Sequence, residues 1–493
     1  DALDQIVLLE NVCSECGDVI SSYAYTYDDN GNITSETAGE SLVGYLYDSK
    51  HDGKHDDKHD ELYPHGLKHN GKHDKDGNGQ ARYIETTRSY TYDENDRLIG
   101  CEETDPNYGA TVYTYSYDEV GNRIRAKETL KGELISETVY TYNDSNQLVK
   151  AETTEMVAKN KNKKEEKQTT TEYTYDTNGN LISETDGTET KTYTYTAENR
   201  LKAVSDGSHI LLAATYDGDG EKIFQLDYVE PEKKNNGNGN GNKKENHEIP
   251  VIPEDASDGL SELYEMASGA TGSYTLTEYL NDVNRENTEV LAEIGMDGAV
   301  KKAYTYGEQR LSVDETGADG SSSSFYLYDA RGSVSALSQK GGTLLESYQY
   351  DPFGQMTFGT PADVNVYGYN AESYNKTTGL LYLRARHYDT ETGRFLTEDG
   401  YLGTLGNPMS RNRYAYGEGN PLGNVDPSGH STLTRTIGTA VGMAVSSVGK
   451  MAGQVLSTAG AKAKETAKKA QDVAAKYSKS SSSIVRTVAN TMR

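Results

Sequence analysis

The sequence predicts an all-β protein in which tandem β-hairpins form a curled antiparallel β-shell, followed by a short tail that is helical or disordered. Two observations predict this fold. The chain holds 39 Tyr in 493 residues but only 5 Phe and no Trp, and one short tyrosine pattern recurs along it. Tyrosine favours strands and half-buried sheet faces, because its ring is apolar while its hydroxyl still finds a partner. The 49 Gly against 10 Pro indicate many tight turns.

The repeated unit is Tyr-x-Tyr, an acidic or amide residue, a polar turn, a hydrophobic position and a polar strand. In the copy YTYDTNGNLISET, Tyr173 and Tyr175 point to one face of a strand because side chains alternate. Asn178 and Gly179 supply the turn, and Leu181 starts the returning strand. One hairpin cannot bury its tyrosine face alone, so neighbouring hairpins must pair. The other copies are residues 23–37, 89–104, 113–129, 140–153, 193–207, 215–226, 304–317 and 325–339.

Three polar insertions interrupt the repeats. Residues 158–168 and 232–248 are rich in Lys, Glu, Asn and Gly, and they are predicted to be loops because they hold too few apolar side chains to pack. Residues 51–80 hold six of the ten histidines in the chain. A solvated loop is the interpretation that this Asp- and Gly-rich composition favours, with a transition-metal site as the alternative.

A calcium-binding spacing lies at the end of the first insertion. Asp74, Asp76, Asn78, Gly79 and Glu85 match the pattern D-x-[DN]-x-[DN]-G-x5-E. Their carboxylate and amide oxygens are the ligands that Ca²⁺ prefers. The flanking segments do not resemble the two helices of an EF-hand, so a polar loop is the alternative to a calcium site.

From residue 348 the pattern changes, and the new strings are the most specific motifs of the chain. The repeats resemble the RHS or YD-repeat family, and the new strings resemble its RHS repeat-associated core. The resemblance divides the chain into a repeat region at 1–340, a core at 341–430 and a variable C-terminal segment at 431–493. It implies a spiral β-shell that encloses a toxic C-terminal polypeptide and is closed by the core. The matching core positions are Asp351 to Gly354, Gly379 to Tyr382, Arg384, Arg386, Tyr388, Gly393 to Phe395, Asp399, Asn420 and Pro421, and Asp426 to Gly429.

The resemblance implies an aspartyl self-cleavage centre at Asp399 and Asp426, assisted by an upstream arginine. Two close carboxylates do not both ionise easily, so one keeps a proton while the other activates water. Arg384 or Arg386 would orient a loop or stabilise the oxyanion. The cut is expected just after the Asp-Pro-Ser-Gly turn, near His430, as a single-turnover step. No other catalytic signature is present.

Two departures from the family pattern favour the alternative, in which Asp399 and Asp426 cap turns and Arg384 pairs with a carboxylate of the core. Gly400 follows the first aspartate, where cleaving relatives often have proline. His430 stands where they usually have a large apolar residue.

The C-terminal segment has a different charge. Residues 431–493 carry ten Lys and Arg against Glu465 and Asp472, a net charge of +8, which leaves −36 for residues 1–430. Three interpretations stay open: a membrane-active toxin tip, favoured by the Gly-x3-Gly spacings at 438–442 and 449–453; a linker to a toxin domain; and a partner-binding tail. The acidic balance of the shell disfavours nucleic acid as its partner.

The function predicted from the resemblance is the shell and core of a polymorphic toxin that encapsulates and delivers a C-terminal effector. The effector segment itself and an immunity protein are the expected partners. The alternative is a cell-surface adhesin whose exposed tyrosine rings stack on carbohydrate. No basic-then-apolar leader precedes the repeats, so the chain is expected to be part of a larger protein that is secreted or on the cell surface.

Overall fold

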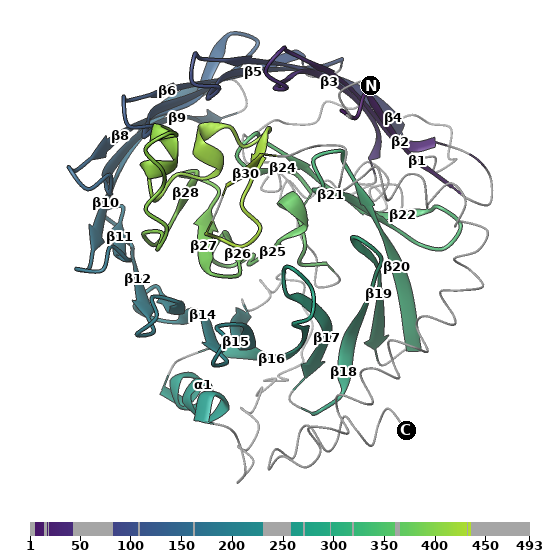
Figure 1. Cartoon of the computed structure of the whole chain (residues 1–493), viewed down its shortest axis with the longest axis vertical. Helices are drawn as coiled ribbons and strands as arrows, with labels where there is room; N and C mark the ends of the chain where they lie inside the picture. The colour runs from purple at the N-terminus through teal and green to yellow at the C-terminus, as the bar shows by residue number, and fades with distance from the viewer. Residues whose placement is uncertain are drawn as a thin grey trace.

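The described part of the chain is dominated by one long antiparallel sheet. The computed structural model describes residues 5–13, 17, 19–42, 82–106, 109–160, 163–229, 258–269, 272–295, 297–317, 320–359, 365–430 and 432–434. Within these residues, 22 strands form a sheet that curls into an open ring (Figure 1). Each strand pairs with the next one along the chain, so the sheet is a meander, as the repeats predict.

The strands of the ring vary from 4 to 13 residues. They are β1 (Leu8–Val12), β2 (Val19–Tyr27), β3 (Ile33–Leu42), β4 (Arg82–Tyr92), β5 (Leu98–Asp105), β6 (Gly109–Tyr117), β7 (Arg123–Leu130), β8 (Glu133–Tyr142), β9 (Leu148–Asn160), β10 (Lys163–Tyr175), β11 (Leu181–Thr185), β12 (Thr190–Tyr195), β13 (Leu201–Ser205), β14 (Ile210–Tyr216), β15 (Lys222–Val229), β16 (Ser273–Asp282), β17 (Glu289–Gly295), β18 (Val300–Tyr306), β19 (Arg310–Gly317), β20 (Gly320–Tyr328), β21 (Val334–Ser338) and β22 (Leu344–Ser347).

A register shift recurs where each repeat turns back. In the hairpin of β12 and β13, Thr194 pairs with Ala203 but Tyr195 pairs with Leu201, so one residue of the returning strand is left unpaired. The extra residue lets Leu201 face the tyrosine side although Ala203 faces the other side. Both Tyr193 and Leu201 are buried on the inner face. The predicted one-sided placement of the Tyr-x-Tyr pairs is therefore confirmed.

The second tyrosine of each pair also links its hairpin to the preceding one. The hydroxyl of Tyr195 donates to the backbone carbonyl of Leu181, 2.7 Å away in the neighbouring hairpin. This carbonyl lies at the register shift, where the sheet ladder does not use it. The same bond joins Tyr27 to Ile6, Tyr92 to Ile33, Tyr117 to Leu98, Tyr142 to Arg123, Tyr216 to Leu201, Tyr306 to Val290, Tyr328 to Arg310 and Tyr350 to Val334.

The inward direction of the tyrosines bears on the carbohydrate-binding alternative. Ring stacking on sugars requires tyrosine faces that are open to solvent, but the Tyr-x-Tyr rings are buried or half-buried on the inner face. Among the described residues, the exposed large apolar side chains include a single tyrosine, Tyr401. The structure therefore gives this alternative no tyrosine surface along the repeats.

The predicted loop at residues 158–168 is wrong. Strands β9 and β10 continue through it as an extended hairpin, in which Lys164 pairs with Ala158 and Glu165 with Val157. Its side chains are largely exposed, so the hairpin needs no apolar face, and Lys159 pairs with Glu165 across the strands. Backbone pairing carried over from the flanking strands outweighs the polar composition. The insertions at 51–80 and 232–248 lie outside the described residues.

The two ends of the meander meet without joining in one ladder. Asn11 in β1 donates from Nδ2 to the backbone carbonyl of Tyr328 in β20, at 3.1 Å. Gln349, just after β22, donates to the carboxylate of Glu40 in β3, at 2.7 Å. The last strands of the sheet thus lie next to its first strands after about one turn of the ring, as Figure 1 shows.

The helix α1 (Asp258–Gly269) covers the outer side of the ring at β14 and β15 (Figure 1). Its Leu260 and Leu263 are buried against Phe224 and Leu276, so the outer face is apolar at this place. No helix of the described residues is long and apolar enough to cross a membrane.

The core segment lies inside the ring, against its tyrosine face (Figure 1). It follows directly after β22 and consists of short elements. They are β23 (Gln349–Tyr350), β24 (Met356–Phe358), η3 (Tyr369–Ala371), β25 (Ser373–Tyr374), β26 (Leu380–Leu383), β27 (Arg386–Asp389), β28 (Arg394–Phe395), η4 (Pro408–Arg411), η5 (Gly417–Gly419), β29 (Asn424–Val425) and β30 (Leu433–Thr434).

The tyrosine hydroxyl bonds should contribute measurably to stability. Tyr195→Phe removes the donor and leaves the buried carbonyl of Leu181 without it, so we expect a loss of about 1–2 kcal/mol in the free energy of unfolding. Urea denaturation followed by circular dichroism measures the change. Tyr401→Phe, on an exposed ring, is the matched control and should stay within about 0.5 kcal/mol of the parent. Equal urea midpoints for the parent, Tyr195→Phe and Tyr401→Phe would contradict a structural role for the tyrosine hydroxyl bonds.

Candidate functional site

Cationic side chains anchor the core at a position where the repeat usually has an aliphatic residue. Arg123, Lys222 and Arg310 each follow a register shift at the position that Leu181 and Leu201 occupy in other hairpins. Each cation lies over an aromatic ring of the core. The guanidinium of Arg310 is 3.2 Å from the ring centroid of Tyr367, that of Arg123 is 4.4 Å from Phe353, and the Lys222 ammonium is 4.2 Å from Tyr382.

Lys222 is buried at this junction. Burial, which disfavours the charged form, lowers its pKa to about 8. Its Nζ donates to Oε1 of Gln225 at 2.5 Å. The side chain therefore belongs to the packed junction between shell and core.

The candidate cleavage turn at residues 426–430 is gripped by the hairpin between β26 and β27. Three successive carbonyls of the turn accept from three successive residues of that hairpin. Arg384 donates from Nη1 to the carbonyl of Pro427 at 2.6 Å, the backbone N–H of Ala385 donates to Ser428 at 3.2 Å, and Arg386 donates from Nε to Gly429. The turn is thus fixed along its backbone, independently of its side chains.

Gly429 fits this grip because it has no side chain. A Cβ at this position would lie 2.3 Å from the carbonyl oxygen of Leu383, and the φ angle of +74° is one that L-residues rarely adopt. The glycine of the Asp-Pro-Ser-Gly motif is therefore required both for backbone conformation and for close approach.

The two aspartates predicted as the catalytic pair come together at one arginine. The Nη2 atom of Arg386 is 2.7 Å from Oδ2 of Asp399 and 3.1 Å from Oδ2 of Asp426. All three side chains are at least nine-tenths buried, and the guanidinium also lies over the ring of Phe395 at 3.5 Å. Burial lowers the pKa of Arg386, against the opposing effect of both carboxylates. One buried guanidinium therefore contacts both carboxylates.

His430 touches both carboxylates. Its backbone N–H donates to Oδ1 of Asp426 at 3.0 Å, and its Nδ1 is 3.2 Å from Oδ1 of Asp399. The imidazole is about half exposed, at 55%. Arg413 also contacts this site, because its Nε donates to the backbone carbonyl of Asp399 at 2.6 Å. Peptide groups next to His430 thus contact the carboxylates and the arginine together.

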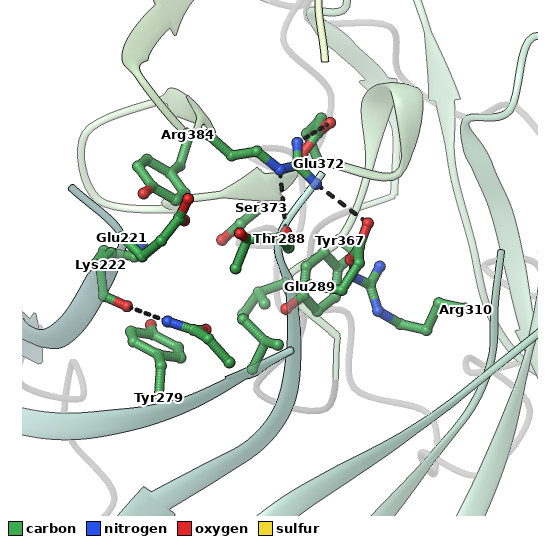
Figure 2. A pocket seen from close by; sticks show the side chains of 14 residues that line it. Glu221, Lys222, Tyr279, Thr288, Glu289, Arg310, Tyr367, Glu372, Ser373 and Arg384 are labelled. Atoms are coloured by element: carbon green, nitrogen blue, oxygen red, sulfur yellow. Dashed lines mark hydrogen bonds and ion pairs between the residues drawn. The ribbon is translucent and has the colours of Figure 1, made fainter. Parts of the chain in front are cut away.

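Arg384 does not join the aspartate pair. Its guanidinium pairs with Glu372 of the core at 2.9 Å and with Glu289 of the shell at 3.1 Å, as Figure 2 shows. This is the carboxylate pairing that the turn-cap alternative predicts, and Asp426 likewise accepts backbone and hydroxyl bonds within its own turn. Both hypotheses for Asp399 and Asp426 thus agree with these contacts.

Sequence reasoning missed the shell residues that reach this site. Glu289 and Arg310 belong to weak or unrecognised repeats, and Arg413 lies in a stretch of core without a predicted role. The one signal available was the cation at the aliphatic position of the repeat, visible in Arg123, Lys222 and Arg310.

The calcium hypothesis rests on residues that are mostly outside the described part of the chain. Asp74, Asp76, Asn78 and Gly79 lie outside it, whereas Glu85 is an exposed residue of β4 that pairs with Gly39. Within the described residues, no group of three or more His, Cys, Asp or Glu is placed to hold a metal ion.

Comparison with known proteins matches two family models to this chain. The RHS Repeat model matches residues 175–209 and the Teneurin YD-shell model matches residues 310–422. The tRNA3(Ser)-specific nuclease WapA of Bacillus spizizenii is 34% identical over 271 residues, which are 53% of this chain and 11% of that protein. Teneurin-3 of Danio rerio is 31% identical over 105 residues, 20% of this chain and 4% of that protein.

Among solved structures, the crystal structure of TcdB2-TccC3-Cdc42 aligns with 86% of this chain and 21% of its own, at 15% identity and a TM-score of 0.33. A TM-score this low supports no further argument. The repeats, the curled sheet and the enclosed core define a YD-type β-shell protein. The chain is similar to RHS/YD-repeat proteins over residues 175–209 and 310–422. It spans about a tenth of the WapA nuclease that it matches.

Carboxyl groups at the junction of shell and core make stability depend on pH. Burial, reinforced by the nearby carboxyl of Asp351, raises the pKa of Glu128 to about 7, and burial raises the pKa of Asp351 to about 6. A folded-state pKa above the unfolded value means stability that is complete at low pH and lost as pH rises through 6–7. For Glu128 we expect a loss on the order of 2 kcal/mol between pH 5 and pH 8.

Glu128→Gln should remove this part of the pH dependence. Urea midpoints of parent and variant at pH 5 and pH 8 give the change of stability with pH for each protein. The other titrating groups contribute equally to both proteins, so the difference between the two changes reports Glu128. Glu133→Gln, an exposed carboxylate of the next strand, should keep the parent slope. A Glu128→Gln protein with the parent slope would contradict the assignment.

Proposed function

We propose that the chain is the shell and core of a polymorphic toxin, which encapsulates and delivers a C-terminal effector and detaches it by one self-cleavage beside His430. The observation that carries the proposal is the convergence of Asp399, Asp426 and Arg386 on the turn at residues 427–430. This turn stands where the net charge changes from −36 for residues 1–430 to +8 for residues 431–493. The likeness of the repeats to the WapA nuclease supports a toxin shell.

The cleavage is a hydrolysis that the two carboxylates share. One carboxylate accepts a proton from water while the water oxygen adds to the carbonyl carbon of the bond that breaks. The other carboxyl group supplies the proton that the leaving backbone nitrogen takes up. The products are a new carboxyl end on the shell side and a new amino end on the tail. Arg386 stabilises the negative charge through its contacts with both carboxylates and with the Gly429 carbonyl.

We expect the reaction at a peptide bond of His430. The sequence predicts the cut after His430, between residues 430 and 431. The described contacts, from Arg386 to the Gly429 carbonyl and from the His430 N–H to Asp426, fall on the preceding bond. The fragments expected from these two alternative cuts differ by the mass of one histidine residue. Intact mass therefore both detects the cut and identifies the bond that breaks.

The purified chain is predicted to appear as two pieces by intact-mass spectrometry under denaturing conditions. Asp399→Asn and Asp426→Asn should each leave a single 54.0 kDa species, because each removes a carboxyl that must gain or lose a proton. Arg384→Ala should slow the cut. Asp176→Asn makes the same chemical change at a turn of the shell, where Asp176 accepts backbone N–H bonds, and should leave the cut unaltered. An uncut parent after long incubation would mean that both aspartates only cap turns.

After cleavage the tail is predicted to stay with the shell. The +8 tail and the −36 remainder attract each other, and this attraction weakens as salt screens it. Size-exclusion chromatography of the cleaved protein in about 50 mM salt should therefore elute both pieces together, and 1 M salt should shift the ratio towards free tail. Separation of the pieces already at low salt would argue against encapsulation.

A further inference from the structure

One carboxylate of the shell holds two arginines at the boundary with the core. Glu289, the first residue of β17, accepts from Nη2 of Arg384 at 3.1 Å through Oε1 and from Nη2 of Arg310 at 3.0 Å through Oε2. Arg310 belongs to the shell and Arg384 to the core. Figure 2 shows both arginines directed towards Glu289 from opposite sides. Glu289 therefore ties the position of Arg384 to the ring.

Arg384 passes this constraint to the cleavage turn. The Nη1 atom that pairs with Glu372 also donates to the carbonyl of Pro427 at 2.6 Å, and Nε donates to the shell carbonyl of Thr288 at 3.0 Å. The backbone of Arg384 has a φ angle of +54°, in the left-handed region that L-residues rarely adopt. Its own carbonyl accepts from Arg200 of the shell at 3.1 Å. The shell thus contacts Arg384 at its side chain and at its backbone.

The surroundings make the charge of Glu289 matter. The side chain of Arg384 is 14% exposed and that of Glu289 is 25% exposed. Both line a cavity of about 40 Å³ between the ring and the core, together with Glu221, Lys222 and Tyr382. Largely buried ion pairs lose little strength to solvent, and removal of one partner leaves the other charge poorly compensated. Without Glu289, Glu372 is the one carboxylate among the described residues that still pairs with Arg384.

We propose that Glu289 is a positioning residue for self-cleavage: acting through Arg384, it fixes the Pro427 carbonyl and so sets the turn against Asp399 and Asp426. This inference rests on the proposed self-cleavage. Its consequence is an order of events. Glu289 reaches Arg384 only when the ring has wrapped around the core, so the turn is presented to the carboxylates after the shell has formed. An incompletely wrapped chain keeps its C-terminal segment covalently attached.

The test compares single-turnover cleavage rates of full-length variants, followed by intact mass. Glu289→Gln removes the charge but keeps the shape, and should slow the cut about tenfold, as expected for a weakened charge-assisted contact. In Arg384→Ala the additional Glu289→Gln change should have no further effect, because Glu289 acts through Arg384. Glu221→Gln, a carboxylate of the same cavity without an ion pair to Arg384, should cleave at the parent rate.

Non-additivity separates positioning from a general loss of stability. A destabilised shell would slow Glu289→Gln with Arg384→Ala further than Arg384→Ala alone, and that result would overturn the proposal. Parent-like cleavage of Glu289→Gln would overturn it as well. Thermal unfolding of each variant shows that the ring is folded at the assay temperature.

Hydrogen exchange tests the same positioning when the parent does not cleave. The amide of His430 donates to Asp426, so its exchange reports how firmly the turn is held. Glu289→Gln should raise exchange of the peptide that contains residues 428–430 by about tenfold, and Glu221→Gln should not. If the parent is never cut but exchange is faster in Glu289→Gln, the self-cleavage is refuted while the role of Glu289 in positioning the turn is retained. Equal exchange in parent and Glu289→Gln would remove the positioning role itself.

Discussion

The bond from a tyrosine hydroxyl to the backbone carbonyl of the preceding hairpin is the interaction on which the rest of the structure depends. It uses a carbonyl that the register shift withdraws from the sheet ladder, so the irregularity of one hairpin becomes an attachment point for the next. Burying so many hydroxyls would be costly if they were left without partners. In the described residues, nine of these hydroxyls donate to such a carbonyl.

The tyrosine-lined inner face of the ring also determines how the core is held. Where the residue after the turn is aliphatic, as at Leu201, the face is simply apolar. Where it is Arg123, Lys222 or Arg310, the same position presents a cation to an aromatic ring of the core. A small change in the repeat thus converts a packing position into an anchor. Of these anchors, Lys222 contacts Tyr382 in the hairpin that grips the turn at residues 426–430.

The sequence was sufficient to predict the fold because the repeat combines two independent signals. The Tyr-x-Tyr spacing defines the buried face, and the Asn-Gly type turns define where strands reverse, so the curled antiparallel sheet follows. The extended hairpin at 158–168 was not predicted, because polar composition indicates exposure but does not exclude backbone pairing. Composition describes side chains, whereas that hairpin is maintained by main-chain bonds.

The candidate site was only partly predictable for a similar reason. Motif resemblance identified Asp399, Asp426, Arg384 and Arg386, which all lie around one turn in space. It did not distinguish the two arginines, because their roles depend on shell residues far away in the sequence. Arg386 lies between the aspartates, and Arg384 is turned towards Glu289. Neither assignment follows from the residues next to them, since it is the curl of the ring that brings β17 against the core.

The strictly sequential pairing of the 22 strands has a consequence for how the protein is made. Each strand needs only its predecessor as a template, so the sheet is able to grow in step with synthesis, one hairpin at a time. The core is encoded after the ring and meets a surface already lined with tyrosine rings and anchoring cations. Nascent chains truncated within the core would therefore already contain an organised ring, with its inner face still unoccupied.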